Sequence, residues 1–315
     1  MNNKVVFCTG GAGTICSGQV RAMVHLGANA CIIGRNAAKT ESMAKSIETA
    51  RAGSKVIGIG NVDVRNIQSL ESAVERCVKE LGGIDFVMYG LLSSLLHMLA
   101  SRNVDANSFN SAGAAGNFIA PLSGLSSNAF RTVLEIDTLG SFNTLKATLP
   151  ALLKSASAHP NSPTNPSTGG RIIFISAAFH FTGMALQGHV AAAKAGVDAI
   201  SATAALEYGP RGVTSNVITP GPIEGTEGMA RLGDKETEST GEAQRRNPLG
   251  RYGAVKEIAD GTVYLFSDAG SFVNGEVLVI DGGGWRVPMG MAGNKKYPDY
   301  LLDDTFDRRK KESKL

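Results

Sequence analysis

The sequence has little excess charge, no long uninterrupted apolar segment and few cysteines. Its 31 basic and 28 acidic residues leave a net charge of +3, so the chain lacks the basic surface by which proteins bind nucleic acids. The apolar run at residues 86–101 is broken by serines and a histidine and is too short to span a bilayer comfortably. We therefore expect neither a nucleic-acid partner nor a membrane span.

Only four cysteines occur, all in the first quarter of the chain and none in a C-x-x-C pair. This argues against a disulfide scaffold and against a zinc site, so we expect no metal. Hydrophobic residues make up 43% of the 315 residues and charged residues 19%, which is typical of a globular protein with a substantial core.

Short β-type runs alternate with amphipathic helical patterns along most of the chain. We expect strands at residues 5–9, 30–33, within 56–64, and at 84–87, 171–176, 213–219 and 277–280. We expect helices at residues 17–26, 37–50 and 67–81, a surface loop at 155–170 and a mobile lid at 225–246. The alternation predicts an α/β protein with a doubly wound parallel sheet, which binds ligands outside the carboxyl ends of its strands.

A glycine-rich turn, Thr9-Gly10-Gly11-Ala12-Gly13-Thr14-Ile15, follows the first predicted strand. In such a turn the backbone N–H groups approach a pyrophosphate, which then lies at the N-terminus of the next helix. We therefore expect Gly10, Gly13, Thr14 and Ile15 to bind a dinucleotide; the alternative is a plain tight turn.

The second predicted strand ends at Gly34-Arg35-Asn36, without the acidic residue that would bond a ribose 2′-hydroxyl. Arg35 instead offers a cation for a 2′-phosphate, which favours NADP over NAD. Its alternative is a solvated surface arginine. Asp63 and Val64 end the third strand, where a carboxylate could accept a hydrogen bond from the adenine amino group.

Taken together, the motifs resemble those of the short-chain dehydrogenase/reductase family. The matching segments are Thr9-Gly10-x-x-Gly13, Asp63-Val64, Ala112-Gly113-Ala114-Ala115-Gly116, Ala191-Ala192-Ala193-Lys194-Ala195-Gly196, Pro220-Gly221-Pro222-Ile223 and Asp281-Gly282-Gly283. The resemblance extends from residue 4 to about residue 285. It implies one Rossmann-like domain, which we assign to residues 1–290, and homo-oligomers.

The sequence departs from that family at the catalytic positions. Val190 stands where the family has its tyrosine, Ala177 where it has its serine, and Asp137 where it has a helix asparagine. Without the tyrosine hydroxyl, simple alcohol–ketone interconversion lacks its proton donor. This combination is most similar to the peroxisomal 2,4-dienoyl-CoA reductase branch of the family, above all to its fungal members.

That branch implies NADPH-dependent reduction of a fatty 2,4-dienoyl-CoA in peroxisomal β-oxidation. Asp137 and Lys194 would then be catalytic, Lys194 also holding the nicotinamide ribose. The other residues that the resemblance assigns to the cofactor are Ala114, Pro220, Ile223 and Thr226, and to the substrate Arg65, Asn117 and Phe118. We interpret Ser176, His180 and His189 as structural rather than catalytic. The alternatives are another acyl-CoA or ketone reductase and an inactive NADP-binding protein.

Residues 88–111 do not fit the family pattern, which passes almost directly from the strand to the Ala-Gly turn. One hypothesis is a translated intron: the codons of Met88-Tyr89-Gly90 contain a GT donor, Ser111 can supply an AG acceptor, and the join encodes isoleucine. The alternative is an amphipathic lid, because leucines recur here at helical spacing. The tail, residues 291–315, ends in Ser313-Lys314-Leu315, a tripeptide read by the peroxisomal import receptor.

Overall fold

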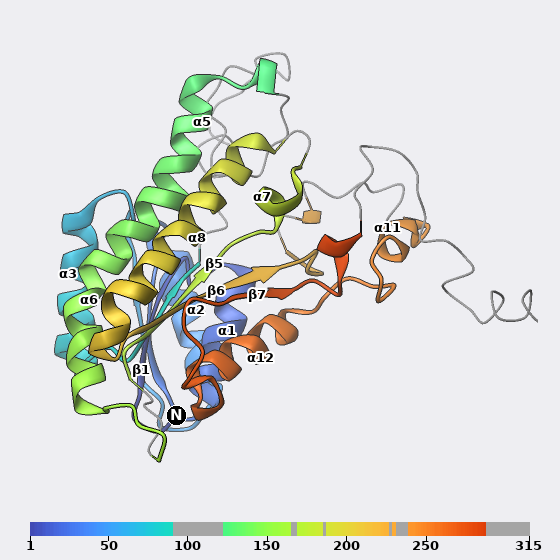
Figure 1. The fold of residues 1–315 in the computed structure, drawn as a ribbon. Coiled ribbons are helices and arrows are strands. Elements are labelled where there is room, and N and C mark those ends of the chain that lie inside the picture. Colours follow the sequence, from blue (N-terminus) through green and yellow to red (C-terminus); the bar gives the residue numbers. More distant parts are fainter. Residues whose placement is uncertain (91–121, 165–168, 185–186, 227–228, 231–238, 288–315) are drawn as a thin grey trace, which may run out of the picture.

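The computed structural model contains one seven-stranded parallel sheet with the order β3-β2-β1-β4-β5-β6-β7 (Figure 1). The strands are β1 (Val5–Thr9), β2 (Asn29–Ile33), β3 (Val56–Ile59), β4 (Phe86–Tyr89), β5 (Arg171–Ile175), β6 (Thr214–Pro220) and β7 (Val277–Ile280). The structure describes residues 1–90, 122–164, 169–184, 187–226, 229–230 and 239–287. The strand order reverses between β1 and β4, so the expected doubly wound α/β fold is confirmed.

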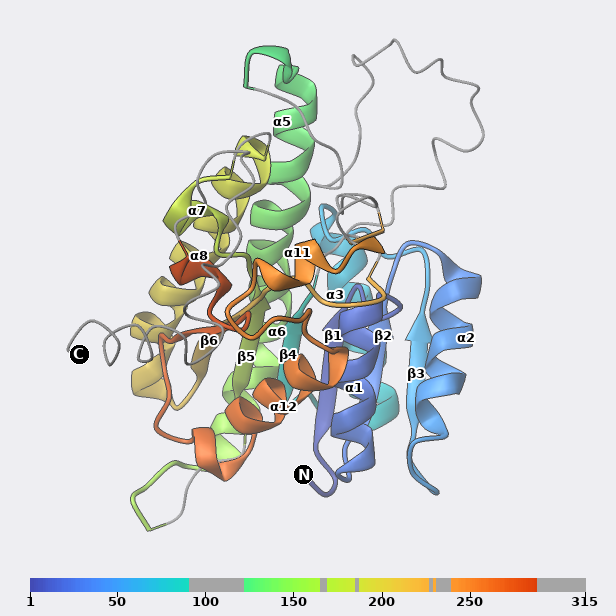
Figure 2. The ribbon, with the colours of Figure 1, turned by 90° about the vertical axis from the view of Figure 1, so that its right-hand side faces the viewer.

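Helices cover both faces of this sheet (Figure 2). One layer contains α1 (Thr14–His25), α2 (Ala37–Glu48) and α12 (Val255–Phe266). The other contains α3 (Ile67–Leu81), α6 (Gly140–Ala158) and α8 (Gly188–Tyr208). α5 (Ser127–Leu134) and the π-helical turn η2 (Glu135–Leu139) lead without a break into α6. The short helices are α7 (Phe179–Thr182), α11 (Glu242–Arg245) and the 3-10 turns η1 (Leu122–Gly124), η3 (Gly209–Arg211), η4 (Asp268–Gly270) and η5 (Gly284–Arg286).

The two helix layers enclose two hydrophobic cores because successive strand residues face opposite sides of the sheet. On β1, Val5 and Phe7 pack into the core under α3, α6 and α8, whereas Val6 and Cys8 pack into the core under α1 and α12. Every residue of β1 is buried. This explains why the central strands are continuous apolar runs rather than alternating ones.

Several boundaries differ from those expected. β3 ends at Ile59, four residues before Asp63, which we expected near its end, because the chain leaves the sheet there. α1 begins at Thr14, three residues before the predicted start, because the glycine turn leads directly into the helix. α6 continues to Ala158, so the polar segment expected to be a loop from residue 155 begins with a helical turn. β4 runs two residues further than predicted. Met88 and Tyr89 are fully buried and pair with β1 and β5, although they were expected to begin the insertion.

All four cysteines are buried as free thiols. Cys8 of β1 lies against Cys16 of α1, and this contact, followed by burial, raises the pKa of the Cys8 thiol well above its usual value. Cys31 of β2 lies against Cys77 of α3, where burial is the main cause of a similarly raised pKa. Each pair therefore joins a strand to the helix that covers it.

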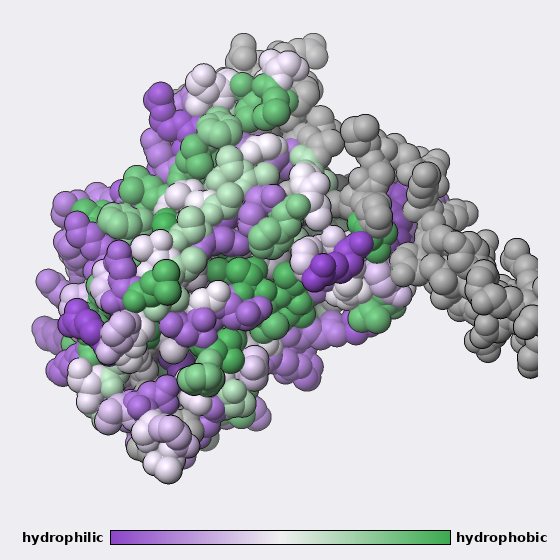
Figure 3. Space-filling model, viewed as in Figure 1, coloured by the Kyte–Doolittle hydropathy of each residue, from purple (hydrophilic) through white to green (hydrophobic). Residues whose placement is uncertain are grey.

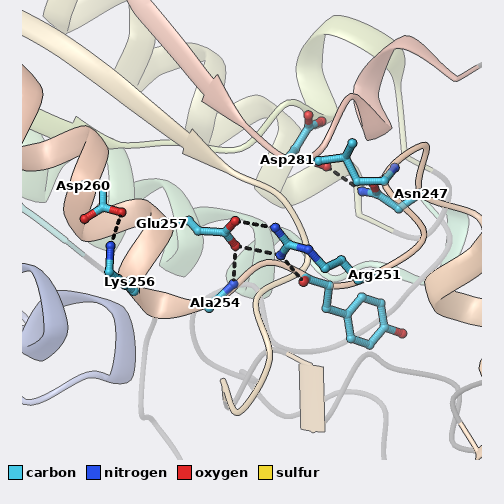
Figure 4. A network of polar contacts seen from close by, with 9 residues as sticks. Asn247, Arg251, Ala254, Lys256, Glu257, Asp260 and Asp281 are labelled. Carbon is cyan, nitrogen blue, oxygen red and sulfur yellow. Dashed lines mark hydrogen bonds and ion pairs between the residues drawn. The ribbon is translucent and has the colours of Figure 1, made fainter.

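α12 is held at both ends by charged side chains. At its start Glu257 accepts a hydrogen bond from the Ala254 backbone N–H (2.7 Å) and is bridged by Arg251 (2.6 Å; Figure 4), which together lower the pKa of Glu257 to about 2. At its end the buried Arg171 donates to the carbonyls of Leu265 (2.8 Å) and Ser267 (2.5 Å). Burial lowers the pKa of Arg171 to about 10.

We predict that Arg171→Met destabilises the fold by about 2–4 kcal/mol, because it removes a buried guanidinium that donates to the carbonyls of Leu265 and Ser267. Chemical denaturation monitored by circular dichroism measures this change. Lys256→Met is the matched control. Its ammonium bonds to Asp260 on the exposed side of α12 (2.7 Å), so the substitution should alter stability by less than about 0.5 kcal/mol. Equal effects of the two substitutions would contradict the prediction.

Candidate active site

The turn between β1 and α1 is built for close approach to its backbone. Gly10 has a positive φ of 60°, and the Gly13 N–H donates to the Gly10 carbonyl at 2.8 Å. A side chain at Gly11 would lie 2.5 Å from Cβ of Ile32, and one at Gly13 would lie 3.2 Å from the Gly10 oxygen. Glycine is therefore required at positions 10 and 11. At Gly13, the N-cap of α1, the lack of a side chain leaves the first N–H groups of the helix accessible to a ligand.

α1 begins at this turn without a capping side chain or an acidic residue in its first turn. The first N–H groups of a helix have no partner within the helix and carry its partial positive charge. Thr14 and Ile15 occupy this first turn, directly after Gly13. An anionic group fits here, which supports the prediction that a pyrophosphate binds at this point.

Three buried hydroxyl groups lie at the carboxyl ends of central strands without a hydrogen-bond partner in the described part of the chain. They belong to Thr9 of β1, to Ser176 directly after β5 and to Thr219 of β6. Because a buried polar atom normally has a partner, these hydroxyls fit a polar ligand lying across the strand ends. The glycine turn and these hydroxyls together fit a dinucleotide.

Arg35, Asp63 and Arg65 form a charged cluster at the ends of β2 and β3. Arg65 donates to Asp63 through Nε (3.0 Å) and Nη2 (2.6 Å), and this fork is the main cause of the lowered pKa of Asp63. Arg35 is half-buried, and burial lowers its pKa while Asp63 opposes that change. Sequence reasoning placed Asp63 and Arg65 in separate roles and missed their pairing. Val64 is buried, and its carbonyl accepts from Asn143 (2.9 Å).

Asp137 lies in the π-helical turn η2, where one extra residue widens the helix between α5 and α6. It is 5% exposed. The buried Tyr89 of β4 donates from its hydroxyl to the Ile136 carbonyl in this turn, which ties the turn to the end of a central strand. π-helical turns are frequent at functional sites, but nothing in the amino-acid pattern revealed this one.

Lys194 of α8 reaches Asp137 across the site. Its Nζ lies 3.1 Å from Oδ2 of Asp137 and donates to the Ile175 carbonyl at the end of β5, also at 3.1 Å. The two charged side chains are 3% and 8% exposed. The two predicted catalytic residues are thus brought together as a buried ion pair beside the strand ends.

The position one turn before Lys194 carries no hydroxyl group. Val190 is buried on the same helix, one turn before the lysine. His189 is fully buried, and burial is the main cause of its lowered pKa, which favours the neutral ring. His180 Nε2 lies 2.9 Å from Oδ2 of Asp198, a contact that the sequence did not predict. It is consistent with our interpretation of His180 as a structural residue.

The segment after β6 carries three predicted cofactor residues. Pro220 ends the strand, Ile223 is buried and pairs with Gly253, and the Thr226 hydroxyl donates to the Ile223 carbonyl at 2.8 Å. Other predicted residues lie outside the described residues: Ala114, Asn117, Phe118, the rest of the insertion after Gly90, part of the expected lid at 225–246 and the tail with Ser313-Lys314-Leu315.

A glycine turn, an uncapped helix and partnerless hydroxyls at the switch point of a doubly wound sheet define a dinucleotide-binding protein. Comparison with known proteins narrows this class. The family model of enoyl-(acyl carrier protein) reductases matches residues 102–284. A solved short-chain dehydrogenase from Bacillus anthracis is 30% identical with a TM-score of 0.69, covering 90% of this chain and 97% of that one.

Curated relatives of this chain also belong to a family of reductases. Peroxisomal 2,4-dienoyl-CoA reductase SPS19, (3E)-enoyl-CoA-producing, from Saccharomyces cerevisiae is 44% identical over 95% of this chain and 89% of its own. A peroxisomal 2,4-dienoyl-CoA reductase from Danio rerio is 36% identical over 90% of this chain and 82% of its own. The chain belongs to the short-chain dehydrogenase/reductase family, and its cofactor is a nicotinamide dinucleotide.

We predict that Gly13→Asp weakens dinucleotide binding at least about tenfold while leaving thermal stability nearly unchanged. An aspartate at this position caps α1, which offsets its tight fit against Gly10, but it places a negative charge where we expect the pyrophosphate. Cofactor fluorescence titration and thermal unfolding give the two readouts. Unaltered binding would show that the helix end is not the anion site.

Proposed function

We propose that this protein is an NADPH-dependent 2,4-dienoyl-CoA reductase that acts in the peroxisomal β-oxidation of unsaturated fatty acids. The observation that carries the proposal is the buried Lys194–Asp137 pair with Val190 in place of a hydroxyl donor. Relatives with 44% and 36% identity named as such reductases support it.

The reaction suits this site because no carbonyl is reduced. A bound nicotinamide cofactor supplies hydride to the far end of the conjugated thioester. Charge then moves to the thioester oxygen, and one proton must be added to carbon. The Lys194 ammonium stabilises this negative charge, and Asp137 orients the lysine and a water molecule that serves as proton source. Neither step needs a tyrosine aimed at an alkoxide.

NADPH is favoured over NADH by the cluster at the ends of β2 and β3. Arg35 offers a half-buried guanidinium beside the expected ribose, while Asp63, the nearby carboxylate, is engaged by Arg65. A 2′-phosphate therefore meets a cation rather than a free carboxylate. We retain Asp63 as an adenine contact and Arg65 as a contact to a CoA phosphate, together with Asn117 and Phe118 in the acyl pocket.

We expect Arg35→Ala to lower kcat/KM for NADPH by about 10- to 100-fold, the loss of one charge-assisted contact, and to leave kcat/KM for NADH nearly unchanged. Steady-state kinetics with each cofactor test this. Arg21→Ala is the matched control, because Arg21 bonds to Ser46 on the exposed side of α1. Equal losses with both cofactors would assign Arg35 a structural role instead.

Homo-oligomers and the peroxisomal matrix are part of the same proposal. Leu139 of η2, Phe142 of α6 and Leu206 of α8 are exposed apolar side chains. Apolar residues also recur on the face of the molecule drawn in Figure 3. A second copy of the chain could cover them. The import receptor that reads Ser313-Lys314-Leu315 would carry the protein into the peroxisome, which fits the peroxisomal names of the relatives. Among the described residues, no helix combines the length and apolar character of a membrane span.

The intron hypothesis also gains a structural argument. Removing residues 88–111 and inserting isoleucine would place Ile, Ala112 and Gly113 in the positions of Met88, Tyr89 and Gly90. A side chain at Gly90 would lie 2.0 Å from Sγ of Cys16, so this position requires glycine, and Gly113 supplies it. The shortened chain can therefore complete β4, although it loses the Tyr89 hydrogen bond.

The decisive assay follows NADPH oxidation at 340 nm with a 2,4-dienoyl-CoA, using the full chain and the shortened form. Turnover by either form supports the reductase, and turnover by the shortened form alone also supports the intron. Asp137→Asn in the active form should lower kcat at least about 100-fold with little change in NADPH affinity. NADPH binding without turnover would favour an inactive binding protein, and turnover of a 3-oxoacyl-CoA instead would favour another reductase.

A further inference from the structure

Two aromatic rings meet at the carboxyl ends of the strands, on the β7 side of the reaction site. Phe181 of α7 and Trp285 of η5 have ring centres 5.8 Å apart and ring planes inclined by 52°. α7 follows the end of β5, and η5 is the red turn that follows β7 in Figure 1. Phe181 is 46% exposed, so the pair presents an apolar surface at the edge where a doubly wound sheet binds its ligands.

Each ring is held in place from its own side. On the α7 side, the ring centres of His180 and Phe181 are 4.0 Å apart, and His180 Nε2 lies 2.9 Å from Oδ2 of Asp198 on α8. On the η5 side, the Asp281 carboxylate accepts a hydrogen bond from the Trp285 backbone N–H at 2.7 Å. The aromatic pair is therefore formed before a ligand arrives, which lowers the entropic cost of binding an apolar chain on it.

The strand order places the reaction site between this aromatic pair and the expected CoA contact. Arg65 follows β3 at one edge of the sheet, whereas η5 follows β7 at the other edge. Lys194 lies between them, because it donates to the Ile175 carbonyl at the end of β5. An extended dienoyl-CoA whose phosphate meets Arg65 and whose thioester meets Lys194 therefore directs its acyl chain toward β7.

We propose that Phe181 and Trp285 bind the distal part of the fatty acyl chain and give the enzyme a preference for long-chain 2,4-dienoyl-CoA substrates. This inference rests on the proposed function, because the contacts to Arg65 and Lys194 set the direction of the substrate. β7 lies two strands beyond β5, about 10 Å at the usual strand spacing. The chain of 2,4-tetradecadienoyl-CoA crosses this distance, whereas that of 2,4-hexadienoyl-CoA ends beside its diene.

The first test compares substrates of different length. In Phe181→Ala, kcat/KM for 2,4-tetradecadienoyl-CoA should fall about tenfold, which corresponds to the loss of about two buried methylene groups. The value for 2,4-hexadienoyl-CoA should stay the same. The loss should appear in KM and not in kcat, because the ring does not touch the reacting carbons. Equal losses with the two substrates, or no loss with either, would overturn the proposal.

Phe272→Ala is the matched control. Phe272 is 99% exposed and precedes β7, so it lies at the opposite end of that strand from η5. Its substitution removes the same exposed ring chemistry and should change kcat/KM for neither substrate.

A second arm does not depend on turnover, because Trp285 is the only tryptophan in the sequence. In the wild type saturated with NADP⁺, tetradecanoyl-CoA should shift the tryptophan emission to shorter wavelength, since the chain displaces water from the indole. CoA alone should cause no shift, and Phe181→Ala should require more tetradecanoyl-CoA for the same shift.

The outcomes of this arm separate the two proposals. An emission that does not respond to saturating tetradecanoyl-CoA would overturn the acyl contact. An equal response to CoA alone would also overturn it and would make the Arg286 guanidinium, stacked 3.8 Å from the indole centre, an anion contact instead. A wild-type protein that shows the tetradecanoyl-CoA shift but reduces no dienoyl-CoA would overturn the proposed function and retain the acyl contact.

Discussion

A lysine ammonium buried between two helices and the end of a strand is the constraint on which the site depends. An unpaired charge at 3% exposure would be strongly unfavourable, so Asp137 must approach Lys194 closely. That approach requires η2 to lie tight against α8. Gly196 permits it, because a side chain there would lie 2.6 Å from Thr138, whose hydroxyl donates to the Ala193 carbonyl. The charge pair thus sets the distance between the helices.

The strands and their topology were predictable from the sequence because a parallel sheet covered on both faces needs continuous apolar runs, and β1 is such a run. The start of α1 was misplaced because glycines conceal a helix N-terminus. β4 ended too early in the prediction because Met88 and Tyr89 resemble the segment that follows them. The Asp63–Arg65 fork and the His180–Asp198 contact were missed for different reasons. The Arg65 side chain can either extend into solvent or pair with Asp63, and the sequence does not decide between these conformations. The second contact joins residues that only the packing of α7 on α8 brings together.

Several backbone and side-chain polar groups that have no partner among the described residues lie at the carboxyl ends of the strands. The uncapped start of α1 and the partnerless hydroxyls of Thr9, Ser176 and Thr219 all lie at the carboxyl ends of the strands. At the opposite end, Asp85 accepts hydrogen bonds from the Val5 N–H and the Ser155 hydroxyl. Within the part of the chain that the structure describes, polar groups lack partners where we expect a ligand to supply them. We therefore expect ligand binding to increase the folding stability of this protein.

The four buried thiols have a consequence for following the motions of this protein. Only a thiolate reacts readily with alkylating reagents, and burial together with sulfur–sulfur contact holds Cys8 and Cys31 in the protonated form. Cys8 and Cys16 span β1 and α1, while Cys31 and Cys77 span β2 and α3. The rate of labelling at each pair therefore reports how often that helix detaches from the sheet, so the native chain carries reporters for separate opening events on its two faces.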